Sequence, residues 1–362
     1  AGGAGPDVVT TPGPSFAFEM AQAGQLLALD EIAAEMGWSE SFVPWALNLG
    51  IVDGKLYSIP NEVETLVLYY NKTLFAEQGW EPPKTLAELM ALAEEIAAAG
   101  IIPFAHGNQE WCPANEWFVG EFLNHGSGGP QKVYEALTGA GQWTDPSFVE
   151  SLTMLDQMQK NGWFMGGLDR YYVTSNADRD AAFAAGEAAM KIEGTWWVAN
   201  APLFFGEEAG TDSDWDWVPV PSASGEAIFD LGIGSTYSIN AKTQYPEAVA
   251  EFLTYYFSPE TQALLAVECG LAPAPVDIPA ESLSGLDPRY AAMLEALNAA
   301  SEAGNYGYTT WTFWPPKSDV YIYEEIEKVW GGDMTVEQYL QGLQTLFDQE
   351  KAAGDIPPIP PR

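Results

Sequence analysis

The sequence predicts an α/β fold that is built as two lobes. Segments with helical periodicity alternate with single short strands along the chain, which is typical of helices that cover mostly parallel sheets. The chain has 362 residues, of which 47% are apolar, so it can bury a sizeable core. Because one sheet is unlikely to organise a chain of this length, we expect two α/β lobes. No internal repeat is present.

The first part of the chain contains a clear helix signal. Thr85 and Glu88 have the spacing of a capping box, so we expect a helix that begins there and ends at Gly100. The pattern of short apolar and alternating runs predicts the strands around it. The other elements expected before residue 100 are strands at 6–10, 55–60 and 65–70 and helices at 16–23 and 31–36.

Trp196 and Trp197 stand side by side after a predicted strand at 190–192 and a turn at Gly194. Neighbouring side chains on an extended segment point in opposite directions, so one ring is expected to face a cleft or water. The remaining expected elements are strands at 101–105, 215–221 (an edge strand, because it ends in prolines) and 237–239, and helices at 116–124, 147–161, 179–185, 246–256, 259–268, 290–303, 319–330 and 335–351, the last capped by Thr335.

The charge of the chain excludes several classes of partner. Acidic residues number 51 against 14 basic ones, which gives a formal net charge of −37. Such a polyanion repels nucleic acids and anionic membrane surfaces. The acids are spread along the chain, which is typical of a solvated surface. Attraction of a cationic ligand is the functional alternative.

Neither a metal site nor another cofactor is expected. Cys112, Cys269, His106 and His125 lie far apart, so the spacing of a zinc motif is absent. Neither histidine has a neighbouring nucleophile, which favours ordinary structural roles for both. No apolar run reaches the about 18–20 residues that cross a bilayer, and the first residues lack the basic and apolar regions of a signal peptide.

The aromatic residues indicate a sugar site. The chain contains 14 tryptophans, and many stand beside Gly, Pro, Asn or acidic residues in segments expected to be loops. The apolar face of a pyranose stacks on an aromatic ring, and its hydroxyls bind Asp, Glu, Asn or Gln side chains. Packing in the core is an equally good explanation for any single ring. The tryptophans in such segments are Trp111, Trp117, Trp143, Trp163, Trp311 and Trp314.

Catalytic and cofactor motifs are missing from the sequence. It has no G-x-S-x-G nucleophile elbow and no P-loop, and Gly232 and Gly234 lack the third glycine of a dinucleotide fingerprint. Residues 212–216 start like an EF-hand calcium loop, but Trp217 stands where that loop needs glycine. The sequence therefore contains none of these catalytic, nucleotide-binding or calcium-binding motifs.

Two pairs of carboxylates are candidates for ligand contacts. Glu62 and Glu64 alternate at the start of a predicted strand, so both face the same side. Glu110 and Glu116 flank a polar, aromatic loop. Each pair fits the two carboxylates of a glycosidase and fits the binding of sugar hydroxyls equally well.

Five stretches of the chain match patterns of one family, in that family's order. They are GPDVV at 5–9, GKLYSIPNEVETLVLYYNKTLFAEQGWEPPKTLAEL at 54–89, FAAGEAAMKIEGTWW at 183–197, GSTYSINAKTQYPEAVAEFLTYYFSPETQ at 234–262 and TTWTFWPP at 309–316. The set resembles the extracellular solute-binding proteins of sugar ABC importers (family 1), the group that includes maltose-binding protein. The family usually has several dozen residues before its P-D-V strand, so the N-terminal segment is expected to be missing from this sequence.

The resemblance implies a two-lobed, periplasmic-binding-protein-like fold of type II, with a ligand cleft between the lobes. Residues 1–66 and 230–282 are expected to form the first lobe, residues 67–229 and 283–355 the second, and residues 356–362 a flexible, proline-rich tail. The resemblance also places Cys112 and Cys269 in different lobes, so both are expected to be free thiols.

The resemblance further implies the site residues. Trp196 is expected to stack on the sugar and Glu64 to bind its hydroxyls, with Trp314 as a second stacking platform, while Trp197 packs into its own lobe. The other candidates are Trp111, Glu110, Glu116 and Trp117 from the second lobe, Ser235 and Thr236 near the lobe crossover, and Glu62.

The implied function is that of an extracytoplasmic binding protein, in the periplasm or lipid-anchored at the outer face of the membrane. Such a protein is not an enzyme, so no catalytic residue is expected. It would capture a mono- or oligosaccharide by hinge closure, as a monomer, and deliver it to the permease subunits of an ABC importer. Three alternatives remain: the same fold binding a polyamine or another cation, a carbohydrate-active hydrolase, and a structural or adhesion module without a small ligand.

Overall fold

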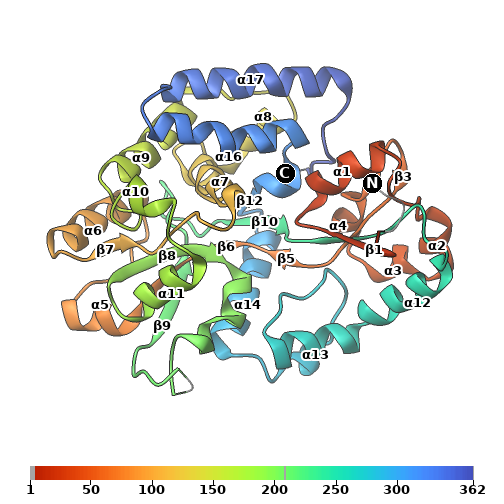
Figure 1. The fold of residues 1–362 in the computed structure, drawn as a ribbon, viewed down its shortest axis with the longest axis horizontal. Helices are drawn as coiled ribbons and strands as arrows, with labels where there is room; N and C mark the ends of the chain where they lie inside the picture. The colour runs from red at the N-terminus through yellow and green to blue at the C-terminus, as the bar shows by residue number, and fades with distance from the viewer. Residues whose placement is uncertain (1–4, 208, 362) are drawn as a thin grey trace.

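The computed structural model describes residues 5–207 and 209–361, which form two lobes joined by crossing strands (Figure 1). The first lobe, on the right of Figure 1, surrounds a three-stranded sheet of order β1-β11-β4. Its elements are β1 (Val8–Thr11), α1 (Pro14–Gln22), α2 (Asp30–Glu35), α3 (Trp38–Ser41), α4 (Pro44–Asn48), β2 (Ile51–Val52), β3 (Lys55–Leu56), β4 (Ile59–Pro60), β11 (Thr236–Ile239), α12 (Pro246–Tyr256), α13 (Pro259–Cys269) and η4 (Ala280–Leu283).

The second lobe surrounds a four-stranded sheet of order β7-β8-β6-β9. Its strands are β6 (Leu66–Asn71), β7 (Ile102–Phe104), β8 (Ala188–Gly194) and β9 (Trp215–Pro219). Its helices are α5 (Lys72–Gln78), α6 (Leu86–Ala98), η1 (Cys112–Ala114), α7 (Asn115–His125), α8 (Gly129–Leu137), α9 (Pro146–Lys160), α10 (Leu168–Tyr171), α11 (Asn176–Ala184), η2 (Thr195–Ala199), η3 (Ala201–Leu203), α14 (Pro288–Glu302), α15 (Thr310–Phe313), α16 (Pro316–Trp330) and α17 (Val336–Ala353).

A small sheet of order β12-β10-β5 lies where the chain crosses between the lobes. Strand β5 (Val63–Glu64) leads out of the first lobe into β6, and β10 (Phe229–Ile233) leads back to β11. The two strands pair antiparallel, with Gly232 opposite Glu64. Strand β12 (Tyr306–Tyr308) pairs with β10 in parallel. The crossover therefore brings together segments from three distant parts of the sequence.

The expectation of mostly parallel sheets is wrong. Strand β6 pairs antiparallel with both β8 and β9, and β11 pairs antiparallel with both β1 and β4. Parallel pairing occurs between β7 and β8 and between β10 and β12. Alternation of helices and strands predicts parallel pairs only where a helical crossover joins neighbouring strands. Most neighbours here come from distant segments, so the alternation does not fix their direction.

The buried apolar residues form one large core and two small ones. The large cluster fills the second lobe around β6 and β8, and the two small clusters draw on residues between Ala17 and Ile59 and between Ile239 and Val276. Ala46 and Leu49 of the first stretch pack into the large core instead. We keep the expected residue bounds of the two lobes as a proposal.

Several local predictions are confirmed. The capping box of Thr85 and Glu88 is present, and Thr335 caps α17. Strand β9 lies at the edge of its sheet, as its prolines indicate. Trp196 and Trp197, by contrast, lie in the 3₁₀ helix η2 and not on an extended segment, since the strand ends at Gly194.

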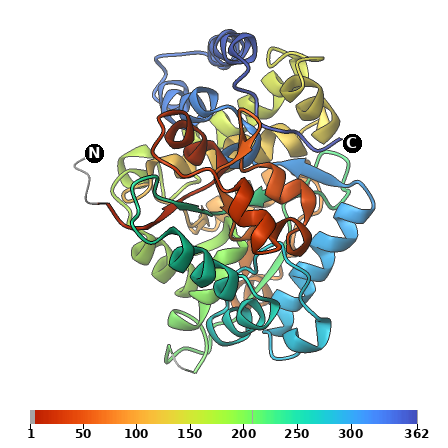
Figure 2. The same ribbon diagram turned by 90° about the vertical axis from the view of Figure 1, so that its right-hand side faces the viewer.

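The C-terminal tail lies against the second lobe, and its expected flexibility stays a prediction. The hydroxyls of Tyr306 and Tyr308 donate to the carbonyls of Pro361 and Pro360, so the tail runs beside β12 (Figure 2). Ile356 and Ile359 pack against the large core. Residue 362 lies outside the described residues.

The two cysteines are free and exposed, Cys112 in the second lobe and Cys269 at the end of α13 in the first. The expectation of free thiols is thus confirmed. Among the described residues, no helix has both the length and the apolar character needed to span a membrane.

Candidate functional site

A cleft between the lobes collects half of the predicted site residues. It encloses about 170 Å³. Its walls come from the start of the first lobe, from the crossover and from the second lobe. The residues that line it are Pro12, Phe16, Glu64, Trp111, Glu116, Trp117, Trp196, Gly234 and Trp311.

Trp196 lies at the centre of an aromatic corner in this cleft. Its ring meets the rings of Trp117 and Trp311 edge to face, with centroids 5.3 Å and 6.4 Å away. Trp111 lies at the rim, where 40% of its surface is exposed. Trp111, Trp117, Trp196 and Trp311 all line the cavity, and an apolar ring face is what a sugar stacks on.

One hydrogen bond and one close steric contact hold Trp196 in place. Its Nε1 donates to Glu193 Oε1 at 3.0 Å. Gly194 lies directly under the ring, where a Cβ atom would approach the ring carbons to 2.0 Å. This explains the glycine two residues before the tryptophan, because any larger residue there would displace the ring.

Trp197 packs into the second lobe, which confirms its predicted place. It is 1% exposed, and its ring lies against those of Tyr69, Phe183 and Trp215. Although η2 is helical, the two adjacent rings still leave the backbone on different sides. One ring therefore faces the cleft and the other fills the core.

Glu64 provides a carboxyl at the base of the cleft. The side chain is buried, and burial together with the nearby charges of Glu62 and Glu193 raises the pKa of Glu64 well above its ordinary value. Gly234 lies against this carboxyl, since a Cβ atom there would come within 1.7 Å of the carboxyl carbon. The glycine of the crossover thus leaves room for the acid.

Glu116 provides a second buried carboxyl, from the start of α7. Thr310 donates a hydrogen bond of 2.7 Å to Glu116 Oε2. Burial raises the pKa of Glu116 well above its ordinary value, and the neighbouring carboxyl of Asp319 adds to the effect. Burial likewise raises the pKa of Asp319 to about 6, with a contribution from the charge of Glu350. Two acids this close share protons more readily than they carry two charges.

A charged network lies behind Trp196 and was not predicted from the sequence. Arg179 forms an ion pair with Glu193, and Lys191 forms one with Asp180. Lys191 is fully buried, and this burial lowers its pKa to about 8. A second cavity of about 250 Å³ is lined by Arg179, Asp180 and Glu193, and it shares three tryptophans with the cleft. Glu193 stands within the matched stretch at 183–197, which is the one signal that could have identified it.

The structure does not bring every predicted residue to the cleft. Trp314 is fully buried and stacks on Trp143 in the core of the second lobe, with centroids 5.2 Å apart. Trp311, one helical turn earlier on α15, takes the place in the cleft that was expected of Trp314. Both tryptophans were candidates from the sequence, and only the orientation of this short helix decides which of them lines the cleft.

Four polar candidates also lie outside the cleft lining. Glu110 is exposed and accepts a hydrogen bond from the backbone N–H of Asn176. Glu62 and Ser235 both accept hydrogen bonds from the Asn61 side chain, at 2.8 Å. Thr236 is buried, and its hydroxyl bonds to that of Thr11. These residues shape the crossover and the loop, and they do not contact the cavity.

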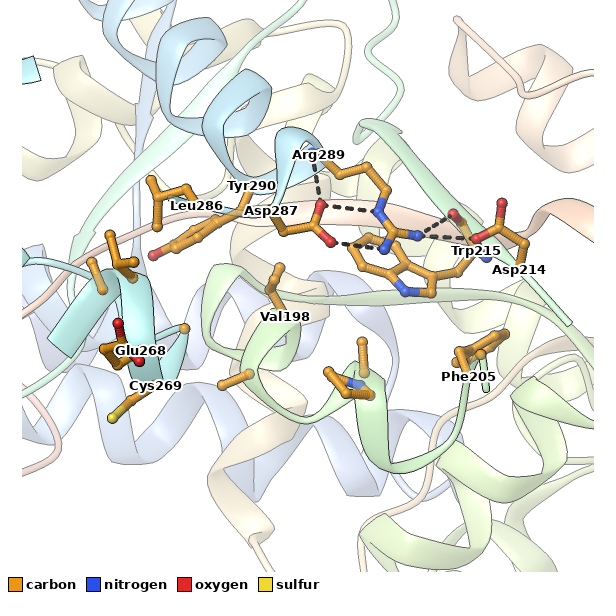
Figure 3. A pocket seen from close by; sticks show the side chains of 17 residues that line it. Val198, Phe205, Asp214, Trp215, Glu268, Cys269, Leu286, Asp287, Arg289 and Tyr290 are labelled. Atoms are coloured by element: carbon orange, nitrogen blue, oxygen red, sulfur yellow. Dashed lines mark hydrogen bonds and ion pairs between the residues drawn. The ribbon is translucent and has the colours of Figure 1, made fainter. Parts of the chain in front are cut away.

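A further cavity of about 340 Å³ lies between α13, the loop before α14 and the segment that follows Trp197 (Figure 3). Charged side chains in its wall already pair with one another. Arg289 forms ion pairs with Asp287 and Asp214 and stacks on Trp215, with Cζ 3.8 Å from the ring centroid. None of the candidate residues predicted from the sequence lines it. We therefore take the cleft as the candidate site.

Comparison with known proteins gives a family and a fold. The family model of the bacterial extracellular solute-binding proteins matches residues 1–263. An uncharacterised ABC transporter extracellular-binding protein of Pyrococcus horikoshii is 28% identical over 73% of this chain and 58% of its own length. The chain thus spans little more than half of that relative.

Two other comparisons cover more of the chain. A probable sugar-binding periplasmic protein of Brucella melitensis is 26% identical over 92% of this chain and 76% of its own length. The solved structure of a chitin oligosaccharide binding protein superposes with a TM-score of 0.80 at 24% identity, over 97% of this chain and 85% of that one. This likeness confirms the two-lobed fold of type II.

Proposed function

The chain belongs to the bacterial extracellular solute-binding protein family, and from that premise we propose that it captures a carbohydrate in the cleft between its lobes. The bound sugar would be a mono- or oligosaccharide, delivered to the permease of an ABC importer outside the cytoplasm. The protein itself would act as a monomer and catalyse no reaction. Members of the family are binding proteins, which supports this proposal.

The observation that carries the proposal is the composition of the cleft. Trp111, Trp117, Trp196 and Trp311 present aromatic surface, and Glu64 and Glu116 present buried carboxyl groups to the same cavity. A pyranose needs both, an apolar ring face for stacking and polar groups for its hydroxyls. At about 170 Å³ the cavity is smaller than the about 300 Å³ of small ligand pockets, which favours a ligand of one or two rings.

The arrangement also supports hinge closure. Glu64 and Gly234 lie at the crossing strands, while Phe16 belongs to the first lobe and Trp196 to the second. A ligand that touches both lobes binds the closed form better than the open form, and this difference in affinity drives closure. The closed form would then be recognised by the permease.

A cationic ligand such as a polyamine is the second candidate, because acids surround the cleft. Glu64 and Glu116 both have raised pKa values, and a bound cation would favour their ionised forms. Cation binding should therefore release protons near neutral pH, whereas a neutral sugar should release far fewer. Calorimetry in two buffers of different ionisation enthalpy measures this release directly.

The first experiment is a thermal-shift screen against mono- and oligosaccharides, polyamines and amino acids, followed by calorimetry on each hit. Ligand at a hundredfold excess over Kd should stabilise the protein by about 2.7 kcal/mol. A sugar hit that is lost in Trp196→Ala and kept in Trp217→Phe would support the proposal, because Trp217 is half-buried on β9 away from the cleft.

Three results would contradict it. Shifts with polyamines alone would favour the cationic ligand. A sugar that binds and is then hydrolysed, as mass spectrometry of the incubated sample would reveal, would indicate an enzyme. No shift with any small molecule would favour a structural or adhesion role.

A further inference from the structure

Glu121, His125 and Asp230 form a buried cluster outside the cleft lining. Glu121 and His125 lie one turn apart on α7 and so share a face, and Asp230 lies on the crossing strand β10. Each side chain is 1% exposed. His125 Nε2 lies 3.2 Å from Glu121 Oε2 and 3.4 Å from Asp230 Oδ1. One ligand atom from each residue thus converges within 4.8 Å of the others.

A backbone carbonyl on the Nδ1 side of the ring orients the imidazole of His125. Its Nδ1 lies 2.9 Å from the carbonyl oxygen of Val220. A carbonyl only accepts hydrogen bonds, so Nδ1 carries a proton, and Nε2 faces the two carboxyl groups. Histidines that bind metals are oriented in this way, with the second nitrogen donating to a carbonyl or carboxylate.

The surrounding backbone is built to accept the Asp230 carboxylate. Gly307 of β12 lies opposite Asp230, and a Cβ atom there would approach Oδ1 to 1.8 Å. The Asn124 amide donates to the carbonyls of Gly120 and Tyr308 and accepts from the N–H of Tyr308. Helix α7 and strand β12 are thereby fixed to each other without any contribution from the cluster.

Several polar atoms of the cluster have no hydrogen-bond partner of good geometry in the part of the chain that the structure describes. Within the described residues, His125 Nε2, Glu121 Oε2 and both oxygens of Asp230 make no hydrogen bond. The ion pairs formed there by Glu121 and Asp230 are both with His125, and none involves a lysine or an arginine. Buried polar atoms without a hydrogen-bond partner are costly, and three of these atoms, one from each residue, face the same point.

We propose that Glu121, His125 and Asp230 bind a divalent transition-metal cation of the Zn²⁺ type. Such a cation would give Glu121 Oε2, His125 Nε2 and Asp230 Oδ1 a common partner, which none of them has among the hydrogen bonds of the described residues. Bonds of about 2.0–2.2 Å in a tetrahedral arrangement place two ligand atoms about 3.3–3.5 Å apart, close to the separations of 3.2 and 3.4 Å from Nε2. A mixed set of imidazole and carboxylate ligands suits zinc or manganese, whereas calcium and magnesium prefer oxygen alone.

The sequence predicts no metal site, because the three ligands have no motif spacing. The fold brings Asp230 to α7 from a distant strand. The cation joins the end of α7 to the strand that leads to Gly234, and the start of the same helix carries Glu116 and Trp117 into the cleft. It therefore braces one wall of the cleft against the crossover.

The test is a titration of chelator-treated protein with Zn²⁺ and with Co²⁺. High salt and excess Mg²⁺ are needed to suppress weak binding to the acidic surface. We expect one equivalent of Zn²⁺ to bind and raise Tm, and one equivalent of Co²⁺ to develop visible absorption bands. Losing a residue behind a metal ligand costs about 10- to 100-fold in affinity, so Glu121→Gln and His125→Gln should each lose at least that much.

Glu226→Gln is the matched control, because Glu226 is exposed on the loop before β10 and should leave Zn²⁺ affinity unchanged. Should the buried variants fail to fold, ¹⁵N NMR of the wild-type histidines decides the question. Zn²⁺ should shift the Nε2 resonance of His125 and leave His106 unchanged, since His106 is packed against Phe118. An imidazolium at His125 that does not respond to Zn²⁺, or equal affinity in all variants, would overturn the proposal.

Discussion

The cleft and the core of the second lobe are lined by the same kind of side chain, in different surroundings. Trp196 is half-buried and lines a cavity, while Trp197, the next residue, is 1% exposed and enclosed by Tyr69, Phe183 and Trp215. Both rings have edge-to-face neighbours. What separates the cleft ring from the core ring is therefore contact with the cavity.

The largest expected effect is the loss of stability when Trp197, the core ring, is replaced. Trp197→Ala should lower the free energy of unfolding by about 3–5 kcal/mol, because it leaves a cavity among well-packed rings. Urea unfolding followed by far-ultraviolet circular dichroism measures this. Trp111→Ala at the exposed rim is the control and should change stability by less than about 1 kcal/mol. Equal losses in both variants would remove the distinction between cleft and core.

The buried acids at the cleft should make stability depend on pH. The pKa of Asp319 is raised to about 6 in the folded protein, so between pH 4 and 6 the folded state holds more protons than the unfolded state. Stability from this group is present at low pH and is lost as pH rises through about 6. The loss amounts to up to about 3 kcal/mol, at 1.36 kcal/mol for each pKa unit.

Asp319→Asn should flatten this part of the stability–pH profile, because the amide does not titrate. The measurement is the free energy of unfolding between pH 4 and 7 for wild type and variant. The opposite result is a wild-type stability that rises from pH 4 to 7 and a variant stability that stays flat. It would show that the sign of the pKa shift at Asp319 is wrong.

The cleft ring should affect binding more than folding. Trp196→Ala should weaken sugar binding by about 10- to 100-fold, since the stacked ring face and its buried area are lost. Its effect on stability should be smaller than that of Trp197→Ala. Calorimetric titration with the sugar identified in the screen gives the affinity. Trp311→Ala should weaken sugar binding in the same way, whereas Trp314→Ala should lower the stability of the fold.

The smallest expected effect concerns the glycine beneath the cleft ring. Gly194→Ala should tilt the Trp196 ring, because the new Cβ would lie 2.0 Å from its carbons. The Trp196 ring is still present in this variant, so sugar affinity should fall less than in Trp196→Ala. Gly24→Ala is no suitable control, since Gly24 has a positive φ. Gly331→Ala, at the end of α16, is suitable. Unchanged sugar affinity in Gly194→Ala would mean that the ring position is not set by this contact.

Local signals in the sequence predicted local structure well. The capping boxes at Thr85 and Thr335 and the edge position of β9 follow from hydrogen bonds and steric limits within a few residues. For the candidate site, the sequence indicated Trp196 and Glu64, which line the cleft, although the backbone at Trp196 is the 3₁₀ helix η2 and not the expected extended segment. The strand directions were not predictable, because pairs such as β1 with β11 join distant segments.

The sequence by itself determined the two-lobed α/β class, the excess of acidic charge and the presence of aromatic and carboxylate groups suited to a sugar. Tertiary structure alone decided which of these groups share a cavity. Trp311 and Trp314 lie on one turn of chain, yet the packing of α15 sends one to the cleft and the other onto Trp143. The buried meeting of His125 with Asp230 was decided in the same way. Local preferences act over a few residues, whereas contacts between distant segments depend on how all the elements pack together.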